Sequence, residues 1–119
     1  MAGELVPLVM LPRYSTYAGA TTFYTIAMDV TEYQKAILNF WRGPGPGTPN
    51  VELYFEESTD SINWSACTNV ASPETQAADT EVQYTPDLKK RWFRVRLVLS
   101  GTNPVVSCWA VGFLERRES

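Results

Sequence analysis

Residues 91–99 read Arg-Trp-Phe-Arg-Val-Arg-Leu-Val-Leu, and this stretch decides the fold class. Every second residue from Phe93 to Leu99 is bulky and apolar, whereas the alternate positions include Arg94 and Arg96. Successive side chains of a β-strand point to opposite faces, so this alternation predicts a strand with one buried face and one face in water.

The same two-residue period runs through most of the chain, and no window repeats with the period of a helix. The predicted strands cover residues 22–30, 35–42, 51–56, 62–68, 81–85, 91–99 and 105–114. Strands that recur about every ten residues predict an all-β protein built as an antiparallel sandwich.

Two of these strands separate bulky side chains onto one face. Residues 22–30 place Tyr24, Ile26, Met28 and Val30 together. Residues 105–114 place Trp109, Val111 and Phe113 on one face and the smaller Cys108, Ala110 and Gly112 on the other. In each case the pattern defines the two faces of the strand.

Turn-forming residues mark the connections. Residues 43–50 are rich in glycine and proline, cannot pair in a ladder, and predict a surface loop. Residues 69–79 are small and polar and are expected to form a second exposed loop. Residues 100–104, Ser-Gly-Thr-Asn-Pro, predict a hairpin-type loop.

The two ends depart from this pattern, so the predicted layout is an N-terminal arm at 1–20, a sandwich domain at 21–114 and a charged C-terminal tail at 115–119. The apolar stretch 5–11 is flanked by prolines and can be at most an edge strand or an extended arm. We expect it to seek a groove or a sheet edge on another subunit. The alternative is an edge strand on its own domain.

Composition limits the chemistry that the chain can perform. Its 119 residues suit one domain, with enough apolar side chains for a core without disulfides or metal. Histidine is absent, which removes the usual triad base and metal ligand. We therefore expect no enzyme activity, no cofactor and no metal, and we expect Cys67 and Cys108 to be buried free thiols.

Neither a membrane nor a secretory pathway is indicated. The apolar runs are too short to cross a bilayer, and the start Met-Ala-Gly-Glu-Leu lacks the basic region of a signal peptide. The sequence therefore predicts a protein made in the cytoplasm.

Charge is distributed unevenly along the chain. Residues 1–88 carry three basic and eleven acidic side chains, whereas residues 89–119 carry seven basic and two acidic ones. Opposite poles favour association with copies or with a charged partner. The alternative is that neighbouring strands neutralise one another within the monomer.

Residues 51–64 follow the pattern strand, Glu56-x-Ser58-x-Asp60, turn, Trp64, and this pattern resembles discoidin-like β-sandwich modules. Residues 90–97 resemble the late strand of those modules, where an aromatic residue precedes alternating arginines. The resemblance covers residues 51–113, and many small structural proteins of tailed bacteriophages are similar in outline. It implies a jelly-roll or discoidin-like sandwich, and the lack of calcium-binding acidic clusters favours a virion protein over a sugar-binding one.

Three groups of polar residues are candidates for chemical sites. Glu57 and Asp60 could ligate calcium, but Ser58 and Asp60 are better explained by hydrogen bonds within their own turn. Glu52, Glu56 and Glu57 could supply a glycosidase pair, but a row of surface charges explains them more simply. The arginines around Trp92 could bind single-stranded nucleic acid, but an acidic pI near 4.9 argues against it.

The predicted function is a non-enzymatic virion structural protein, a capsid decoration or cement protein bound to the major capsid protein or other virion proteins, in a homo-oligomeric or symmetric assembly without nucleic acid or membrane. The alternatives are a carbohydrate-binding module of a tail or baseplate and a tail or neck connector. The candidate interface residues are Leu5, Val6, Leu8, Val9, Met10, Leu11, Arg91, Trp92, Arg94, Arg96, Arg116 and Arg117.

Overall fold

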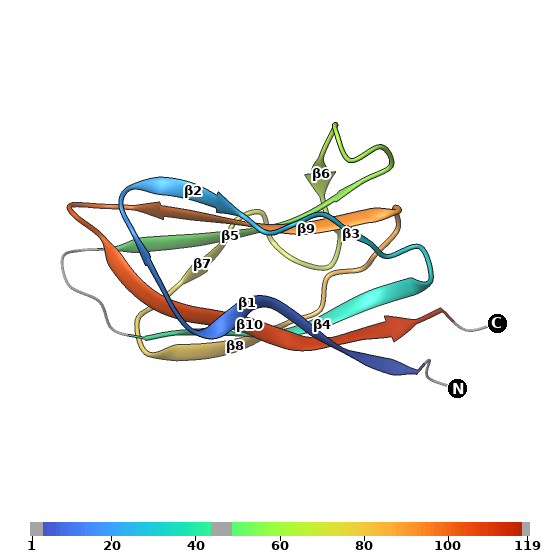
Figure 1. The fold of residues 1–119 in the computed structure, drawn as a ribbon, viewed down its shortest axis with the longest axis horizontal. Helices are drawn as coiled ribbons and strands as arrows, with labels where there is room; N and C mark the ends of the chain where they lie inside the picture. Colours follow the sequence, from blue (N-terminus) through green and yellow to red (C-terminus); the bar gives the residue numbers. More distant parts are fainter. Residues whose placement is uncertain (1–3, 44–48, 118–119) are drawn as a thin grey trace.

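The computed structural model describes residues 4–43 and 49–117, which form strands and connections without a helix in those ranges. The strands make two antiparallel sheets that lie face to face (Figure 1). One, the β10 sheet, has the order β1 (Leu5–Ala18), β10 (Val105–Arg116), β4 (Tyr33–Arg42) and β8 (Thr80–Tyr84). The other, the β9 sheet, has the order β2 (Thr21–Tyr24), β9 (Trp92–Ser100), β5 (Asn50–Ser58) and β6 (Ser65–Ala66), with β3 (Met28–Asp29) pairing with β9 and β7 (Glu74–Gln76) pairing with β5.

The order of the strands is that of a jelly roll. The chain changes sheet at each main step except after β5, because β6 and β7 follow it in the chain and pair with it in the same sheet. Eight strand positions result when β3 is counted with β2, and β6 with β7. This arrangement of two sheets occurs in viral capsid proteins, lectins and cupins. The predicted all-β sandwich is confirmed.

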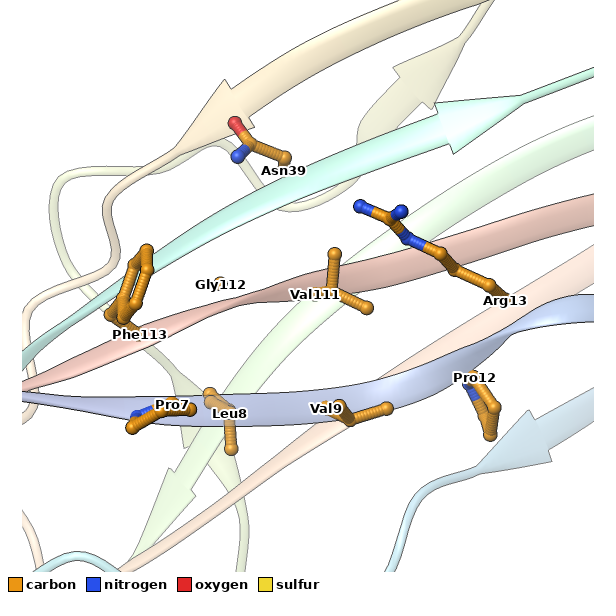
Figure 2. Close-up of a pocket in the computed structure, with 9 residues that line it drawn as sticks. All are labelled: Pro7, Leu8, Val9, Pro12, Arg13, Asn39, Val111, Gly112 and Phe113. Carbon is orange, nitrogen blue, oxygen red and sulfur yellow. The ribbon is translucent and has the colours of Figure 1, made fainter.

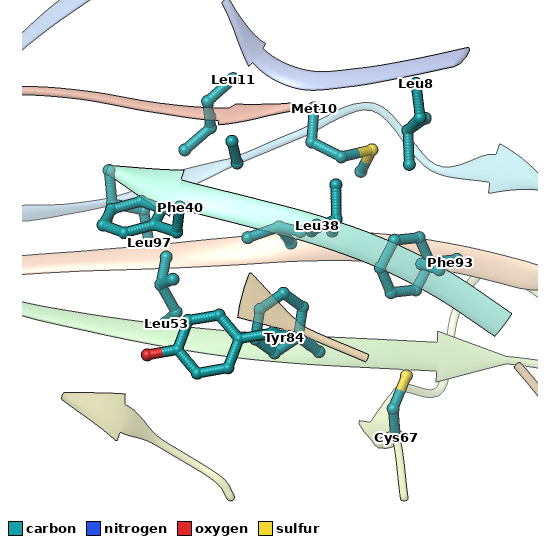
Figure 3. Packing of buried hydrophobic residues seen from close by; sticks show 14 of the residues in the cluster. Leu8, Met10, Leu11, Leu38, Phe40, Leu53, Cys67, Tyr84, Phe93 and Leu97 are labelled. Carbon is teal, nitrogen blue, oxygen red and sulfur yellow. The ribbon is translucent and has the colours of Figure 1, made fainter. Parts of the chain in front are cut away.

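The core lies between the sheets and is built from the alternating faces seen in the sequence. In β9 the residues Phe93, Val95, Leu97 and Leu99 are all buried, as predicted. They meet large side chains such as Leu38 from β4 (Figure 3). Each such side chain stabilises the fold by about 1.5–3 kcal/mol when fully buried.

Strand β10 turns its small side chains toward the core. Cys108 and Ala110 are buried, whereas Trp109, Val111 and Phe113 lie on the outer face of the sheet. Next to them, a Cβ atom at Gly112 would overlap the carbonyl oxygen of Ile37 on β4, so only glycine fits there. The bulky face of this strand is therefore left outside the core.

The extended N-terminal arm is corrected to an edge strand of the same domain. Strand β1 pairs with β10 from Leu5 opposite Glu115 to Ala18 opposite Val105. Its free edge tolerates Pro7 and Pro12 because an edge residue needs no partner for its outer backbone groups. Leu8, Met10 and Leu11 of β1 are buried in the core between the sheets, so the strand belongs to its own domain.

Three other expectations for individual segments were wrong. Residues 22–30 form two short strands, since residues 25–27 leave the ladder, and Phe23 rather than Tyr24 packs inward. The strand predicted at 62–68 is reduced to β6 because Asp60 binds the preceding residues into a turn. The loop predicted at 69–79 contains β7, whose backbone completes the edge of β5.

The predicted hairpin at 100–104 joins strands of different sheets, since β9 and β10 belong to opposite layers. A turn sequence specifies that the chain reverses, but the neighbouring strands decide where it pairs. The first residues of the predicted tail belong to the sheet, because β10 continues to Arg116. The backbone N–H of Arg117 then donates to the Glu32 carbonyl. Residues 118 and 119, and residues 44–48 of the glycine- and proline-rich loop, lie outside the described ranges.

Candidate interaction surfaces

The outer face of the β10 sheet is apolar. Val9 on β1 is 61% exposed and Phe113 on β10 is 42% exposed, and Val111 lies between them in the sheet. With Pro7 these residues form what we call the apolar face: Pro7, Val9, Val111 and Phe113. A shallow hollow of about 560 Å³ lies over it, with Asn39 and Arg13 at its margin (Figure 2).

A pair of tryptophans extends this face toward the far end of β10. The rings of Trp41 and Trp109 stack with centroids 4.3 Å apart, and the guanidinium of Arg13 lies 5.1 Å from the Trp109 ring. A Cβ atom at Gly43 would overlap the Trp41 ring, so glycine allows the ring to lie against the backbone. The stack fixes these large side chains outside the core.

Strand β1 divides the predicted apolar contact residues between its two faces. Leu8, Met10 and Leu11 are buried in the core of their own chain. Leu5 and Val9 are exposed, and Val6 is half-buried. Only the outward half of the predicted set is therefore available to a partner.

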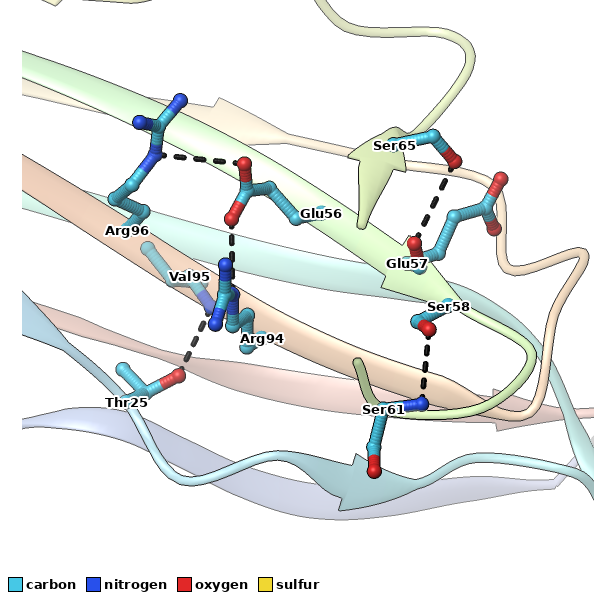
Figure 4. Close-up of polar contacts among 9 residues, drawn as sticks. All are labelled: Thr25, Glu56, Glu57, Ser58, Ser61, Ser65, Arg94, Val95 and Arg96. Carbon is cyan, nitrogen blue, oxygen red and sulfur yellow. Dashed lines mark hydrogen bonds and ion pairs between the residues drawn. The ribbon is translucent and has the colours of Figure 1, made fainter. Parts of the chain in front are cut away.

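The outer face of the β9 sheet has a different character, because its arginines are paired within the chain. Arg94 Nε donates to Glu56 Oε1 at 2.9 Å, and Arg96 Nε lies 3.4 Å from Glu56 Oε2 (Figure 4). The Arg94 guanidinium also lies 4.1 Å from the ring of Trp64 and 4.6 Å from that of Tyr24. Two arginines thus share one carboxylate, and aromatic rings cover them.

The remaining predicted basic residues also contact their own chain. Arg91 pairs with Asp29 at 3.1 Å and lies over the half-buried ring of Trp92. Arg116 pairs with Glu4 at 3.1 Å, and the hydrogen bond that its guanidinium donates to that carboxylate raises the pKa of Arg116. Arg117 donates to two backbone carbonyls. In the described ranges, four of the seven basic side chains of residues 89–119 therefore pair with carboxylates of residues 1–88, which favours neutralisation within the monomer.

Asp60 organises the turn that follows β5. Its Oδ1 accepts hydrogen bonds from the backbone N–H groups of Ile62 and Asn63 at 2.9 and 2.8 Å. These bonds, and one from Ser58, hold the pKa of the Asp60 carboxyl well below its usual range. The turn explanation is thus supported. In the described ranges no group of three or more Cys, Asp or Glu side chains is placed to hold a metal ion.

Glu56 and Glu57 also have partners within the chain. The Glu57 carboxylate is buried and accepts the backbone N–H of Lys89 at 2.9 Å, while Glu56 pairs with arginines. Cys67 and Cys108 are buried free thiols, as predicted, and burial raises the pKa of Cys108 to about 12. Among residues 4–43 and 49–117, no helix has the length and apolar character needed to cross a membrane.

Comparisons with known proteins bear on the fold. The sequence matches no protein-family model and no curated protein. A chain in the solved structure of infectious bursal disease virus, Gx strain, superposes with a TM-score of 0.63 at 9% sequence identity. The two chains share a fold. The match covers 95% of this chain and 32% of the viral chain, so this protein spans about a third of its length.

The sequence pattern alone does not identify the apolar face as a surface, although part of the signal is present in it. The bulky side of β10 was visible in the alternation of Trp109, Val111 and Phe113, but either side of the strand could have faced the core. The surface also needs Val9 from β1, more than one hundred residues away in sequence but directly opposite Val111 in the sheet.

Proposed function

We propose that this protein is a non-enzymatic structural component of a virion, and that it makes subunit contacts through the apolar face. The observation that carries the proposal is the outward placement of large apolar side chains on a jelly-roll sandwich. Contiguous exposed apolar surface of this kind marks protein–protein contacts. The fold shared with a chain of a virus structure supports the same class of function.

The physical basis is the removal of apolar surface from water. The sheet keeps Val9 and Phe113 exposed to water. A partner that covers them gains about 25 cal/mol of binding free energy for each Å² of apolar surface that is buried. A single contact of this size is weak, but closed symmetry repeats it many times over a particle, and repetition raises the overall affinity. A stiff sandwich with one apolar side suits such repeated contacts.

The specific form that we propose is a capsid decoration or cement protein of a tailed bacteriophage, with the major capsid protein or another virion protein as its partner. The residues that support it are the outward side chains of β1 and β10, since the arginines of the β9 sheet already have partners in their own chain.

The test is whether the protein belongs to particles. Particles from the source of the sequence would be purified by density gradient, and peptides of the chain quantified across the fractions by mass spectrometry. We expect the peptides to follow the particle peak in a fixed ratio to the major capsid protein. Particles stripped of the protein should lose heat stability and regain it when the purified chain is added back.

A matched pair of variants assigns the contact. Val9→Asp places a charge in the apolar face, whereas Gln83→Asp places the same charge on the outer face of β8, at an exposed position of the same sheet. Only the first should prevent add-back. Absence of the chain from the particles, or tight and selective binding on a glycan array without affinity for particles, would contradict the proposal and favour a carbohydrate-binding module.

A further inference from the structure

The turn after β5, residues 58–64, is held rigid by its own side chains, and we call it the Asp60 loop. Ser58 Oγ accepts the N–H of Ser61 at 2.9 Å and that of Asp60 at 3.1 Å. Asp60 then accepts the next two N–H groups and the side-chain amide of Asn63 at 3.0 Å. The loop has a fixed shape without help from the core, so little conformational entropy would be lost when it binds.

This rigid loop holds an apolar side chain in water. Ile62 is 77% exposed, one of the most exposed large apolar residues in the described chain. The loop projects outward from the β9 sheet, beside β6 (Figure 1). Asp60 is exposed in the same loop, and its lowered pKa keeps its carboxylate charged near neutral pH. The loop thus presents one apolar side chain beside one negative charge.

The opposite side of the molecule offers a complementary hollow. The hollow over the apolar face belongs to the β10 sheet, and its volume of about 560 Å³ is larger than an isoleucine side chain. Val9, Val111 and Phe113 supply its apolar lining, and the exposed guanidinium of Arg13 stands at its margin (Figure 2). The hollow therefore has room for the projecting side chain, and the two match in polarity and in the sign of the neighbouring charges.

We infer that the Asp60 loop of one copy inserts into the hollow over the apolar face of a second copy. Ile62 then packs on Val9 and Phe113, and Asp60 faces Arg13. The inference deepens the proposed structural function by naming a second copy of this chain as the occupant of the hollow.

The contact has a definite symmetry. The loop lies on the β9 sheet and the hollow lies on the β10 sheet, so the two copies use different surfaces. The contact therefore cannot be the symmetric contact of a two-fold dimer, in which both copies use the same surface. Such a head-to-tail contact continues from copy to copy and forms a ring or a filament. Each copy uses one loop and one hollow.

The experiment measures self-association of the purified full chain. Sedimentation velocity over a range of protein concentrations should show a mass that rises with concentration. Ile62→Asp removes the projection, and Val9→Asp spoils the hollow. Each should weaken association about tenfold or more, since each prevents burial of a large apolar side chain. Circular dichroism melts of both variants check that they remain folded.

Mixing the two variants gives the decisive result. Ile62→Asp retains an intact hollow and Val9→Asp retains an intact loop, so a mixture can form one contact and should give dimers and nothing larger. Gln83→Asp is the control, because Gln83 is exposed on β8 and lies outside both the loop and the hollow. It should associate as the unaltered chain does.

Three results would overturn the inference: a chain that stays monomeric at high concentration, association that survives Ile62→Asp, or a mixture of the two variants that forms no dimer. A monomeric chain that still joins particles would leave the proposed virion function standing and remove only self-association as the use of the hollow. The two proposals therefore fail separately.

Discussion

The side chains on the outer faces of the two sheets differ in whether they have partners within their own chain. On the β9 sheet, Glu56 binds both Arg94 and Arg96, and the rings of Tyr24 and Trp64 cover one of these arginines. On the β10 sheet, the equivalent surface is apolar and open to water, around Val9, Val111 and Phe113.

The difference shows that a conspicuous sequence feature need not be the contact surface. The sequence indicates the alternating arginines as a possible interface. In the structure they form buried or half-buried ion pairs, so their charges are already neutralised within the chain. The β10 sheet has fewer charges. Its outer face exposes apolar surface to water, and only a partner can cover that surface.

The largest expected effect comes from removing the strand on which the apolar face and the core meet. Deleting residues 1–12 takes away the buried Leu8, Met10 and Leu11 with half of β1, so cooperative thermal unfolding should be lost. As a milder version, Leu8→Ala should destabilise the fold by about 2–5 kcal/mol, whereas Val9→Ala should cost much less. Urea titration measures both. A truncated chain that melts normally would show that β1 is dispensable and restore the extended arm.

The next largest effect is expected from breaking the ion pairs on the outer face of the β9 sheet. Glu56→Gln leaves Arg94 and Arg96 without their shared carboxylate, and we expect a loss of about 1.5–3 kcal/mol in the free energy of unfolding. The matched control is Glu52→Gln, a change of the same kind four residues earlier on the same side of β5. If the two variants have equal stability, the network contributes nothing and the contrast between the sheets weakens.

A smaller effect on stability, with a clear change in surface behaviour, is expected on the β10 sheet. Phe113→Ser alters a side chain that is 42% exposed, so the free energy of unfolding should fall by about 1 kcal/mol or less. Binding of an apolar fluorescent dye to the folded chain should drop at the same time. Unchanged dye binding would place the exposed apolar surface elsewhere.

The smallest effect concerns pH and the Asp60 loop. The pKa of Asp60 is lowered from its ordinary value of 3.8 in the folded chain by hydrogen bonds from Asn63, Ile62 and Ser58. Its stabilising contribution is therefore present above about pH 4 and is lost as pH falls through the folded pKa. The melting temperature of the unaltered chain should exceed that of Asp60→Ala at pH 7, and the gap should narrow toward pH 2. A gap independent of pH would show that the charge of Asp60 does not hold the loop.

The candidate surfaces could be predicted only in part. The sequence named Val9 and Leu5 as contact residues, but it grouped them with Leu8 and Met10, which the core takes up. It also paired the arginines with acidic strands as one alternative, and the structure supports that alternative. The Asp60 loop was predicted as a turn from its Ser and Asp residues, because those hydrogen bonds are local.

By itself the sequence determined that the protein is an all-β sandwich. The period of two along residues 51–56 and 91–99 fixes a strand with two unlike faces, whatever the strand pairs with, because side-chain direction is a local property of the backbone. The absence of histidine likewise follows from the sequence alone, and it excludes a histidine base or a histidine metal ligand.

Only the tertiary structure decided which face of each strand meets the core and which strands become neighbours. The bulky side of β10 is outside because its other side, with Cys108 and Ala110, packs in the core between the two sheets. Val9 reaches Val111, and Glu56 reaches Arg94, through pairings between segments far apart in the chain. Such pairings depend on the packing of the whole sandwich, so no local pattern could have specified them.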